Sequence, residues 1–365
     1  MDRILGVYVG VNIRKVIAEY DLDRITVVTL ASHSALQLVH GAKKEGFRTA
    51  LIITENRKLF YEQFKHLIDF FIVVNKWSDL CKEQIVKKLI ELNSIFIPHG
   101  SFVEYVGLDC AENIEIPLFG LRSIFRVEAN QHLKMDLLAK AGIPTPKRYS
   151  LGEEINGLVI VKLPGAKGGK GYFLALSKDE IIDGIERAIN QGLINKPSDA
   201  LIQEYVVGVP AYFHFFFSPI FNRLEILGAD IRYESNVDGL RRLKHNVLER
   251  LGIEPSFIVV GNIPMVLRES LLYKVYDYGL RFVKVTRKLL PPGIIGPFCL
   301  EGIIEDDLNI KIFEFSGRIV AGTNLYIQGS PYSFLYWDEP MSTGRRIARE
   351  IKLAIERGEL NSVVT

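Results

Sequence analysis

The sequence predicts a mixed α/β and α+β fold, in which a small parallel sheet precedes mainly antiparallel strands. Short β-branched runs alternate with helical patterns over about the first hundred residues. A segment rich in glycine and proline then stops a helix, and the strands beyond it are joined by short turns. A chain of 365 residues has room for two or three domains. We expect domains at 1–125, 126–220 and 221–365.

The first domain is predicted to be a Rossmann-like parallel sheet. The apolar run Ile25 to Leu30 is followed by a polar turn and by apolar residues at helical spacing up to Gly46, which is typical of a β-α-β unit. The pattern continues with strands over Thr49 to Ile53, Phe70 to Val74 and Ile95 to Ile97, and with a helix over Glu83 to Leu92.

Polar side chains follow two of these strands directly. Ser32 and His33 come after the first strand, and Pro98 to Ser101 come after the last. Because ligand sites in parallel sheets lie at the carboxyl ends of strands, we expect both segments at one edge of the sheet.

The remaining elements are predicted from capping and turn signals. A helix over Arg126 to Ala141 is stopped by Gly142 to Pro146, and a C-terminal helix over Thr343 to Glu356 is capped by Ser342 or Thr343. Between them we expect strands at 158–162, 172–176, 201–205, 212–218, 298–304 and 310–315, and a helix at 178–190.

Composition and charge exclude several classes of protein. Hydrophobic residues make up 48% and charged residues 24%, as in globular rather than disordered chains. Lys plus Arg (45) less Asp plus Glu (43) gives +2, which is too little for a nucleic-acid-binding field. Runs such as Leu67 to Val74 fall short of the roughly 18 to 20 apolar residues that span a bilayer. Neither nucleic acid nor membrane is an expected partner.

The cysteines and the N-terminus bear on the compartment. Cys81, Cys110 and Cys299 are widely separated, so we expect neither a zinc site nor a disulfide framework. Ile4 to Ile13 is apolar, but it continues into Arg14 and Lys15, which indicates part of the fold rather than an export signal. A reducing cytoplasm is the expected location.

The clearest local feature is a predicted hairpin with a glycine-rich tip. Lys162 ends its first strand, and Lys167, Gly168 and Gly169 lie in the loop before the second. Backbone N–H groups and ammonium groups at such a tip can bind phosphates. The motif is not a Walker loop, because G-x-x-x-x-G-K-[ST] is absent there. A flexible surface hairpin with solvated lysines remains the alternative.

A second feature is Gln203 to Gly208, at the end of a predicted strand. A strand that leaves through Glu204, Val206 and Val207 can offer backbone donors and acceptors to a flat heterocycle beside an apolar wall. Taken alone, this segment fits an ordinary strand end with a turn glycine at least as well as it fits a heterocycle-binding strand.

A third feature is the pair Glu301 and Glu314 on two neighbouring strands, flanked by large apolar residues. An isolated buried carboxylate costs several kcal/mol, so a compensating cation is expected. Oxygen ligands shared with nucleotide phosphates favour Mg²⁺ over zinc. A salt bridge, with Arg318 as the candidate partner, is the alternative.

These features occur in an order that is informative. A strand with lysine, a glycine loop, a strand with glutamate and then two carboxylates with Arg318 behind them resemble the ATP-grasp ligases. Several further segments make the resemblance specific to the archaeal PurP family, over nearly the whole chain. They are Thr29–Ser34, Ile97–Phe102, Arg232–Gly239, Gly261–Pro264, Pro291–Gly293, Gly296–Cys299 and Phe313–Ser316.

The resemblance implies an ATP-grasp fold and an ATP- and formate-dependent ligase. Such a ligase converts AICAR, an aminoimidazole carboxamide ribotide, to its formylated product FAICAR through formyl phosphate, in purine biosynthesis. It implies ATP and Mg²⁺ or Mn²⁺ as cofactors, AICAR and formate as substrates, and a homo-oligomer. The triphosphate and adenine would be held by Lys162, Lys167, Gly168, Gly169, Glu204, Val206, Val207 and Glu234.

The resemblance also implies the remaining site residues. Glu301 and Glu314 would carry the metal, Lys162 and Arg318 would act in catalysis, and Arg318 would face the acyl phosphate. AICAR would be held by His33, Ser101 and Asn262.

Some positions depart from the family pattern. Gln131 stands where ATP-grasp chains place Lys or Arg, and Lys134 follows one helical turn later. Leu121, Val127 and Ile231 also differ from the residues usual in the family. A paralogue that ligates another carboxylate and amine, an inactive nucleotide-binding relative, and an interaction protein using the apolar run 213–217 therefore stay open as alternatives.

Overall fold

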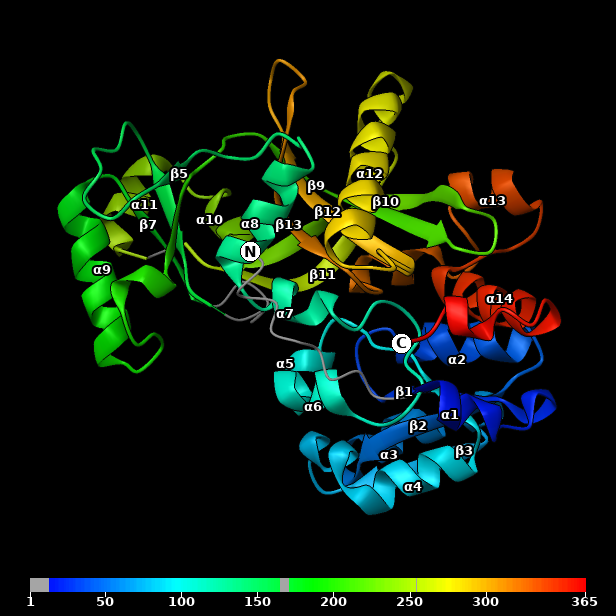
Figure 1. Ribbon diagram of the computed structural model, residues 1–365. Coiled ribbons are helices and arrows are strands. Elements are labelled where there is room, and N and C mark those ends of the chain that lie inside the picture. The colour runs from blue at the N-terminus through cyan, green and yellow to red at the C-terminus, as the bar shows by residue number, and fades with distance from the viewer. Residues whose placement is uncertain (1–12, 165–170, 254) are drawn as a thin grey trace.

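The computed structural model describes residues 13–164, 171–253 and 255–365, and the structural statements below concern these residues. They form three β-sheets with helices packed around them (Figure 1). The predicted loop residues Lys167, Gly168 and Gly169 lie outside the described residues, as does nearly all of the apolar N-terminal run.

The first sheet is parallel, with strand order β3-β2-β1-β4, as the sequence predicted. Every residue of β1 is buried, and Val27 and Val28 belong to different hydrophobic clusters. The strand is therefore covered on both faces, which explains its unbroken apolar run. The strands are β1 (Thr26–Leu30), β2 (Arg48–Thr54), β3 (Phe70–Val74) and β4 (Ser94–Phe96).

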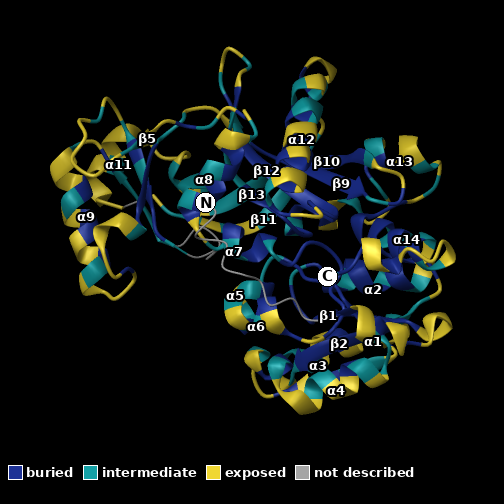
Figure 2. Cartoon of the chain, in the orientation of Figure 1, coloured by how far each residue is buried: buried dark blue, intermediate teal, exposed yellow. Residues whose placement is uncertain are grey.

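Helices connect and cover this sheet, and their exposed residues face outward in Figure 2. They are α1 (Ile13–Ala18), α2 (Ala35–Lys44), α3 (Glu55–Glu62), α4 (Glu83–Glu91), α5 (Phe102–Val106) and α6 (Leu108–Asn113).

One expectation about this domain is wrong. Cys81 and Cys110 form a disulfide, with their Cα atoms 6.0 Å apart, whereas Cys299 is free and buried. The two cysteines are 29 residues apart in sequence, and they meet because α5 packs both on the short helix Trp77–Cys81 and on α6, which carries Cys110. No cysteine motif marks such a pairing.

The second sheet forms a small antiparallel lobe, with strand order β5-β8-β6-β7. The predicted hairpin is its β6-β7 pair, so Lys162 lies at the end of a strand opposite Tyr172. Its apolar face packs on α9, whose N-terminus is capped by the Ser177 hydroxyl. The elements are β5 (Arg148–Tyr149), β6 (Val159–Lys162), β7 (Tyr172–Ala175), α9 (Lys178–Asn190) and β8 (Leu201–Glu204).

The third sheet is antiparallel, with strand order β11-β10-β9-β12-β13. The expected domain boundary at residue 220 falls between β9 and β10, which pair with each other, so the sheets divide nearer to Gly208. The division into three domains stays a prediction. The strands are β9 (Val209–Ser218), β10 (Arg223–Asn236), β11 (Phe257–Met265), β12 (Gly296–Ile304) and β13 (Ile310–Ser316).

The helices around this sheet include two differences from the sequence prediction. The helix expected over 126–141 is interrupted where the Asn130 side chain accepts a hydrogen bond from the Leu133 N–H and starts a new helix. The 21-residue α12, together with β10 and β11, was not predicted. The helices are α7 (Ile124–Glu128), α8 (Gln131–Lys140), α10 (Val237–Leu240), α11 (His245–Leu251), α12 (Glu269–Leu289), α13 (Pro331–Trp337) and α14 (Thr343–Glu356).

The end of the chain returns to the first domain. Ser342 caps α14, as one of the two predicted alternatives, and α14 packs on α2 (Figure 1). Gly344 lies so close to the α2 backbone that an added Cβ would come 2.3 Å from the Gln37 carbonyl oxygen. The first and third sheets therefore share one hydrophobic cluster.

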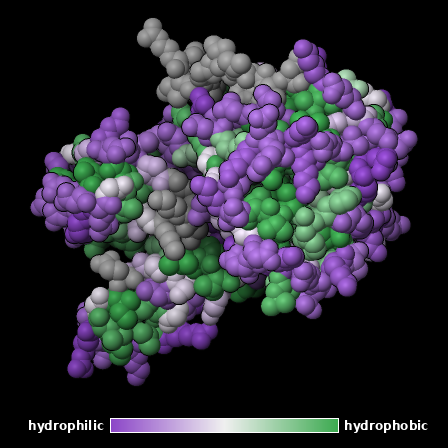
Figure 3. Space-filling model, turned by 90° about the horizontal axis from the view of Figure 1, so that it is seen from below, coloured by the Kyte–Doolittle hydropathy of each residue, from purple (hydrophilic) through white to green (hydrophobic). Residues whose placement is uncertain are grey.

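Among the described residues, no helix is both long and apolar enough to cross a membrane. Figure 3 shows hydrophilic residues over most of the larger body on that face, with hydrophobic residues gathered in smaller areas.

Candidate active site

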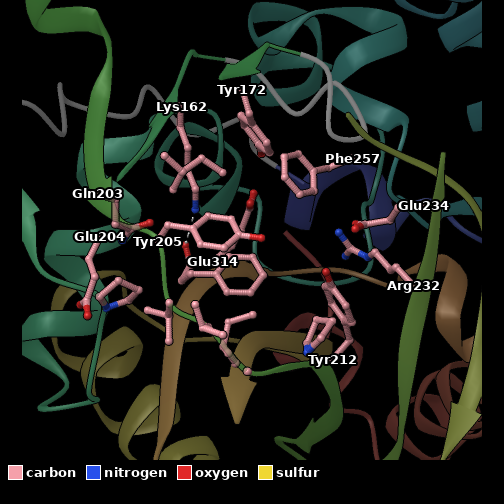
Figure 4. Close-up of a pocket in the computed structure, with 18 of the residues that line it drawn as sticks. Lys162, Tyr172, Gln203, Glu204, Tyr205, Tyr212, Arg232, Glu234, Phe257 and Glu314 are labelled. Atoms are coloured by element: carbon pink, nitrogen blue, oxygen red, sulfur yellow. Dashed lines mark hydrogen bonds between the residues drawn. The ribbon is translucent and has the colours of Figure 1, made fainter. Parts of the chain in front are cut away.

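A cavity of about 240 Å³ lies between the small lobe and the third sheet (Figure 4). Its walls are largely apolar, and polar side chains from both sheets point into it, an arrangement that suits a heterocycle with a polar tail. Five of the residues predicted for the nucleotide line it together: Lys162, Glu204, Val206, Val207 and Glu234.

The carboxylate of Glu204 fixes the segment between the two sheets. It accepts a hydrogen bond from the Lys147 N–H at 3.0 Å and pairs with the Lys311 ammonium at 3.0 Å. The residues after it, Tyr205 to Gly208, line the cavity.

The Lys162 ammonium lies inside this cavity, with only 3% of the residue exposed. It donates a hydrogen bond to the Phe313 carbonyl oxygen at 3.2 Å. Burial lowers the pKa of Lys162 to about 8, although the nearby Glu314 carboxylate opposes the shift. A buried ammonium with donors to spare is suited to a phosphate oxygen.

A second cavity of about 300 Å³ adjoins the first. Both cavities are lined by Tyr172, Arg232, Val259 and Glu314, so the two spaces meet at these side chains. The second is lined by the remaining predicted residues that the structure describes: His33, Ser101, Asn262, Glu301, Glu314 and Arg318.

The two strand-end segments of the first domain meet at one edge, as expected. The rings of His33 and His99 stack at 5.2 Å between centroids and 5° between planes. His99 Nε2 lies 3.1 Å from the Leu30 carbonyl oxygen, and the Ser101 N–H donates to His99 Nδ1 at 3.2 Å, so the proton is on Nε2. Burial lowers the pKa of His33 well below its ordinary value and that of His99 to about 3. Both imidazoles are therefore neutral.

Asn262 is oriented by a buried carboxylate. Its Nδ2 donates to Asp230 Oδ2 at 2.6 Å, and Asp230 Oδ1 lies 2.7 Å from His214 Nε2. Asp230 and His214 are each 1% exposed. Because its amide nitrogen is engaged by Asp230, Asn262 presents its Oδ1 as an acceptor, which fits an N–H group of a ligand.

Glu301 and Glu314 are opposite each other on β12 and β13. The Glu301 carboxylate pairs with Arg232 at 2.9 Å, and Glu314 pairs with Lys134. Arg318, the partner considered from the sequence, contacts neither in these ion pairs. Burial would raise the pKa of Glu314, but the ammonium groups of Lys134 and Lys162 hold it well below its ordinary value. Burial raises the pKa of Glu301, against the opposing charge of Arg232.

This pair of carboxylates fits a magnesium ion shared with a nucleotide. Glu301 Oε2 is buried and lies 2.9 Å from the Arg232 guanidinium, but it receives no well-aligned hydrogen bond from the described residues. No group of three or more His, Cys, Asp or Glu side chains able to hold a metal occurs in the described part of the chain. Mg²⁺ is commonly bound by one or two carboxylates, with phosphates and water completing its shell. Two carboxylates beside the buried ammonium of Lys162 meet that requirement.

Arg318 lines the second cavity but is held by another residue. Its guanidinium pairs with Glu128 of α7, and the two side chains are 8% and 7% exposed. Glu128 also accepts a hydrogen bond from the Gly317 N–H at 3.1 Å. The arginine is thus fixed at the wall of the cavity rather than free to move within it.

The four residues that depart from the family pattern differ in their surroundings: one is a buried polar side chain, and the other three are apolar side chains that line neither cavity. Gln131 is 3% exposed, and its Oε1 has no hydrogen-bond donor among the described residues. Lys134, one turn later and 1% exposed, supplies a cation to Glu314. Leu121 and Val127 are core residues. Ile231 points away from the cavities, because Asp230 and Arg232 on either side of it line the second one.

Several residues of the site were not predicted from the sequence. Arg232, Asp230, His99 and Lys134 all bind to or orient predicted site residues. The alternation of Asp230, Arg232 and Glu234 is a strand pattern with one charged face, and this signal could have been found. The role of Lys134 depends on a contact across 180 residues, which no local pattern shows.

Two family models match the chain. One, described as a protein of unknown function (DUF1246), matches residues 27–149, and the other, described as a domain of unknown function (DUF1297), matches residues 180–365. Together they cover nearly all of the first sheet and all of the third, but not β6 and β7 of the second sheet.

Known proteins similar to this chain include an enzyme and two solved structures. A 5-formaminoimidazole-4-carboxamide-1-(beta)-D-ribofuranosyl 5'-monophosphate synthetase from Ignicoccus hospitalis is 57% identical over 97% of this chain and 99% of its own. The IMP biosynthesis protein PurP from Thermococcus kodakaraensis is 36% identical, with a TM-score of 0.73 over 93% of this chain and 100% of that one. The biotin carboxylase domain of Hydrogenobacter thermophilus 2-oxoglutarate carboxylase, in complex with MgADP and bicarbonate, is 16% identical, with a TM-score of 0.64 over 88% of this chain and 69% of that one. The fold is the predicted ATP-grasp fold.

Proposed function

The chain belongs to the family of 5-formaminoimidazole-4-carboxamide ribonucleotide synthetases, and on that premise we propose that it joins formate to the amine of AICAR using ATP. One observation carries the proposal for this chain. Among the described residues, those expected for the nucleotide and those expected for the ribotide line two cavities that meet at Glu314 and Arg232. A phosphoryl group can thus pass from one bound substrate to the other without leaving the protein.

The reaction proceeds in two displacements. A formate oxygen attacks the γ-phosphorus of ATP, the bond from that phosphorus to the β,γ-bridging oxygen breaks, and ADP and formyl phosphate result. The amine of AICAR then attacks the formyl carbon, phosphate leaves, and the amine nitrogen loses a proton. Positioning and neutralisation of charge are the main tasks of the protein in such a reaction.

The residues of the first cavity would hold the nucleotide. Lys162 would contact the phosphates, and the segment after Glu204 would receive adenine through the backbone at Val206 and Val207, with Glu234 at the far wall. Lys167, Gly168 and Gly169 stay predicted phosphate ligands. A Mg²⁺ or Mn²⁺ ion on Glu301 and Glu314 would neutralise charge on the phosphates when bound.

The residues of the second cavity would hold the ribotide. Neutral His33, Ser101 and the Oδ1 of Asn262 offer it uncharged hydrogen-bonding groups, while Arg318 supplies a fixed positive charge for the acyl phosphate. The proposed substrates, which are small metabolites, support a cytoplasmic location. Self-association is a further expectation from the family resemblance.

The deciding experiment measures ADP release with formate and AICAR, supplied together and singly. We expect sustained ADP release and FAICAR only when both are present. ADP release with another carboxylate or amine, and none with this pair, would favour a paralogue. No ADP release with any pair would favour an inactive nucleotide-binding relative.

Replacing His33 with alanine is expected to weaken AICAR binding more than ATP binding. The imidazole lines the second cavity alone and is neutral, so its loss removes hydrogen bonds worth about 0.5–1.5 kcal/mol each, or roughly 2- to 13-fold in affinity. Separate binding titrations with ATP and with AICAR measure the two effects. Equal effects on both ligands would remove His33 from the ribotide site.

Nucleoside binding is expected to strengthen as the pH rises through neutrality. Burial raises the pKa of Glu234 to about 7, so the carboxyl is mostly protonated at pH 6 and mostly ionised at pH 8. A carboxylate accepts hydrogen bonds from ribose hydroxyls better than a carboxylic acid does, so the affinity should rise about tenfold over this range.

Adenosine is the suitable probe for this pH profile, because its own groups do not titrate between pH 6 and 8. Glu234→Gln should give a profile that is flat. A wild-type profile that is flat or falls with pH would show that Glu234 does not accept from the nucleoside.

A further inference from the structure

Arg232 occupies the junction of the two cavities. Among the described residues it is the one Lys or Arg side chain that lines both, because Lys162 lines only the first and Arg318 only the second. Its position comes from β10, where alternate residues share a face: Asp230 lines the second cavity, Arg232 both, and Glu234 the first. Figure 4 shows Arg232 and Glu234 pointing into the first cavity.

The guanidinium of Arg232 is held in a fixed plane. It lies over the Tyr212 ring at 3.8 Å from the ring centroid, and it pairs with Glu301 at 2.9 Å. The side chain is 25% exposed, and since it lines both cavities this exposed part faces them. The ion pair and the ring are its close contacts within the described residues, which leaves N–H donors of its fork for a ligand.

The charge of a transferring phosphoryl group is spread over three equatorial oxygens while its bonds to the two substrates break and form. A planar guanidinium can donate hydrogen bonds to two such oxygens at once. A guanidinium that is reachable from both cavities can contact the phosphoryl group before and after transfer. Arg318 meets only the first of these conditions, because it lines the second cavity alone, and Lys162 meets neither, because it carries an ammonium group and lines only the first cavity.

We propose that Arg232 is a catalytic residue that binds the γ-phosphoryl group during its transfer from ATP to formate, and that it retains the phosphate of formyl phosphate in the second cavity. The inference rests on the proposed function. The bond between the γ-phosphorus and the β,γ-bridging oxygen breaks, a bond between that phosphorus and a formate oxygen forms, and no proton is transferred in this step.

The test follows positional isotope exchange in ATP labelled with ¹⁸O at the β,γ-bridge, with formate present and AICAR absent. Exchange reports reversible formation of formyl phosphate. We expect Arg232→Ala to reduce both this exchange and the kcat for FAICAR formation by about 10²- to 10³-fold, as loss of one preorganised donor does elsewhere. The Kd values for adenosine and AICAR should change far less, by less than about fivefold.

Two further variants separate catalysis from structure. Free guanidinium ion should raise the exchange activity of Arg232→Ala at least about tenfold, whereas a purely structural defect would not respond to it. Arg223→Gln is the matched control: this arginine also pairs with a glutamate and lies over Trp337, but it lines neither cavity and should leave exchange unchanged. Should Arg232→Ala fail to fold, Arg232→Lys keeps the charge for Glu301 but not the fork, and should still lose most of the exchange.

The outcomes distinguish the two proposals. If the wild type shows exchange without formate, or shows none when formate is present, the proposed function and this inference are overturned together. Exchange that requires formate in the wild type and continues unchanged in the Arg232 variants overturns the inference alone. The inference is also overturned if those variants lose only AICAR affinity.

Discussion

Replacing Glu314 with glutamine is expected to abolish ADP formation while the protein remains folded. Glu314 lies opposite Glu301, lines both cavities and is a proposed magnesium ligand. A neutral amide binds Mg²⁺ poorly and leaves Lys134 and Lys162 without their anionic neighbour. We expect kcat to fall at least about 10³-fold, which corresponds to roughly 4 kcal/mol of transition-state stabilisation. Steady-state ADP release with formate and AICAR measures it.

The same substitution is expected to reduce stability, because Lys134 is 1% exposed and loses its carboxylate. The amide oxygen can still accept a hydrogen bond, so the cost should be about 1–3 kcal/mol. Glu45→Gln is the matched control: Glu45 is buried and ion-paired with Arg345 and Arg349, and it lines neither cavity. Glu45→Gln should lower the melting temperature but leave the rate of ADP release unchanged. Turnover by Glu314→Gln equal to that of the wild type would end the metal assignment.

The pH dependence of stability follows from the same carboxylate. The pKa of Glu314 is lower in the folded protein than in the unfolded chain, so its ion pair with Lys134 stabilises the fold above the ordinary glutamate pKa. That stabilisation is lost as the pH falls through the folded-state pKa. Glu314→Gln should therefore narrow the difference in stability between neutral and acidic pH.

Replacing Lys162 with methionine is expected to weaken ATP binding and slow phosphoryl transfer, with little change in AICAR affinity. The ammonium lies in the first cavity and does not line the second. Methionine fills a similar volume without charge, so the loss of one charge-assisted hydrogen bond of about 1.5–3 kcal/mol should lower kcat/KM for ATP roughly 10- to 150-fold. Steady-state kinetics with ATP as the varied substrate tests this.

Lys178→Met is the control for that variant. Lys178 starts α9 on the same lobe, is exposed and lines neither cavity. The Lys178→Met variant should therefore have the same kcat/KM for ATP as the wild type. An unchanged kcat/KM for ATP in Lys162→Met would remove the lysine from the nucleotide site. Equal losses for ATP and AICAR would instead indicate a general distortion of the lobe.

Elements with strong local patterns were predicted correctly. β1 and β2 are continuous apolar runs covered on both sides, and α14 has a capping serine and a clear apolar face. β10 and β11 were not predicted, because β10 carries charged residues on the face that lines the cavities and β11 is only partly buried. Their stability depends on pairing across the third sheet, not on local composition.

The sequence by itself determined the chemical inventory of this protein: the strand-end histidine and serine, the lysine before the glycine loop, and the two glutamates of β12 and β13. Each is marked by a local pattern or by order along the chain. Only the tertiary structure decided which charges meet. Lys134 reaches Glu314 across 180 residues, Arg232 rather than Arg318 pairs with Glu301, and Glu128 holds Arg318. The physical reason is that ion pairs depend on distance in space and on burial, and neither quantity is written in the spacing of residues along a chain.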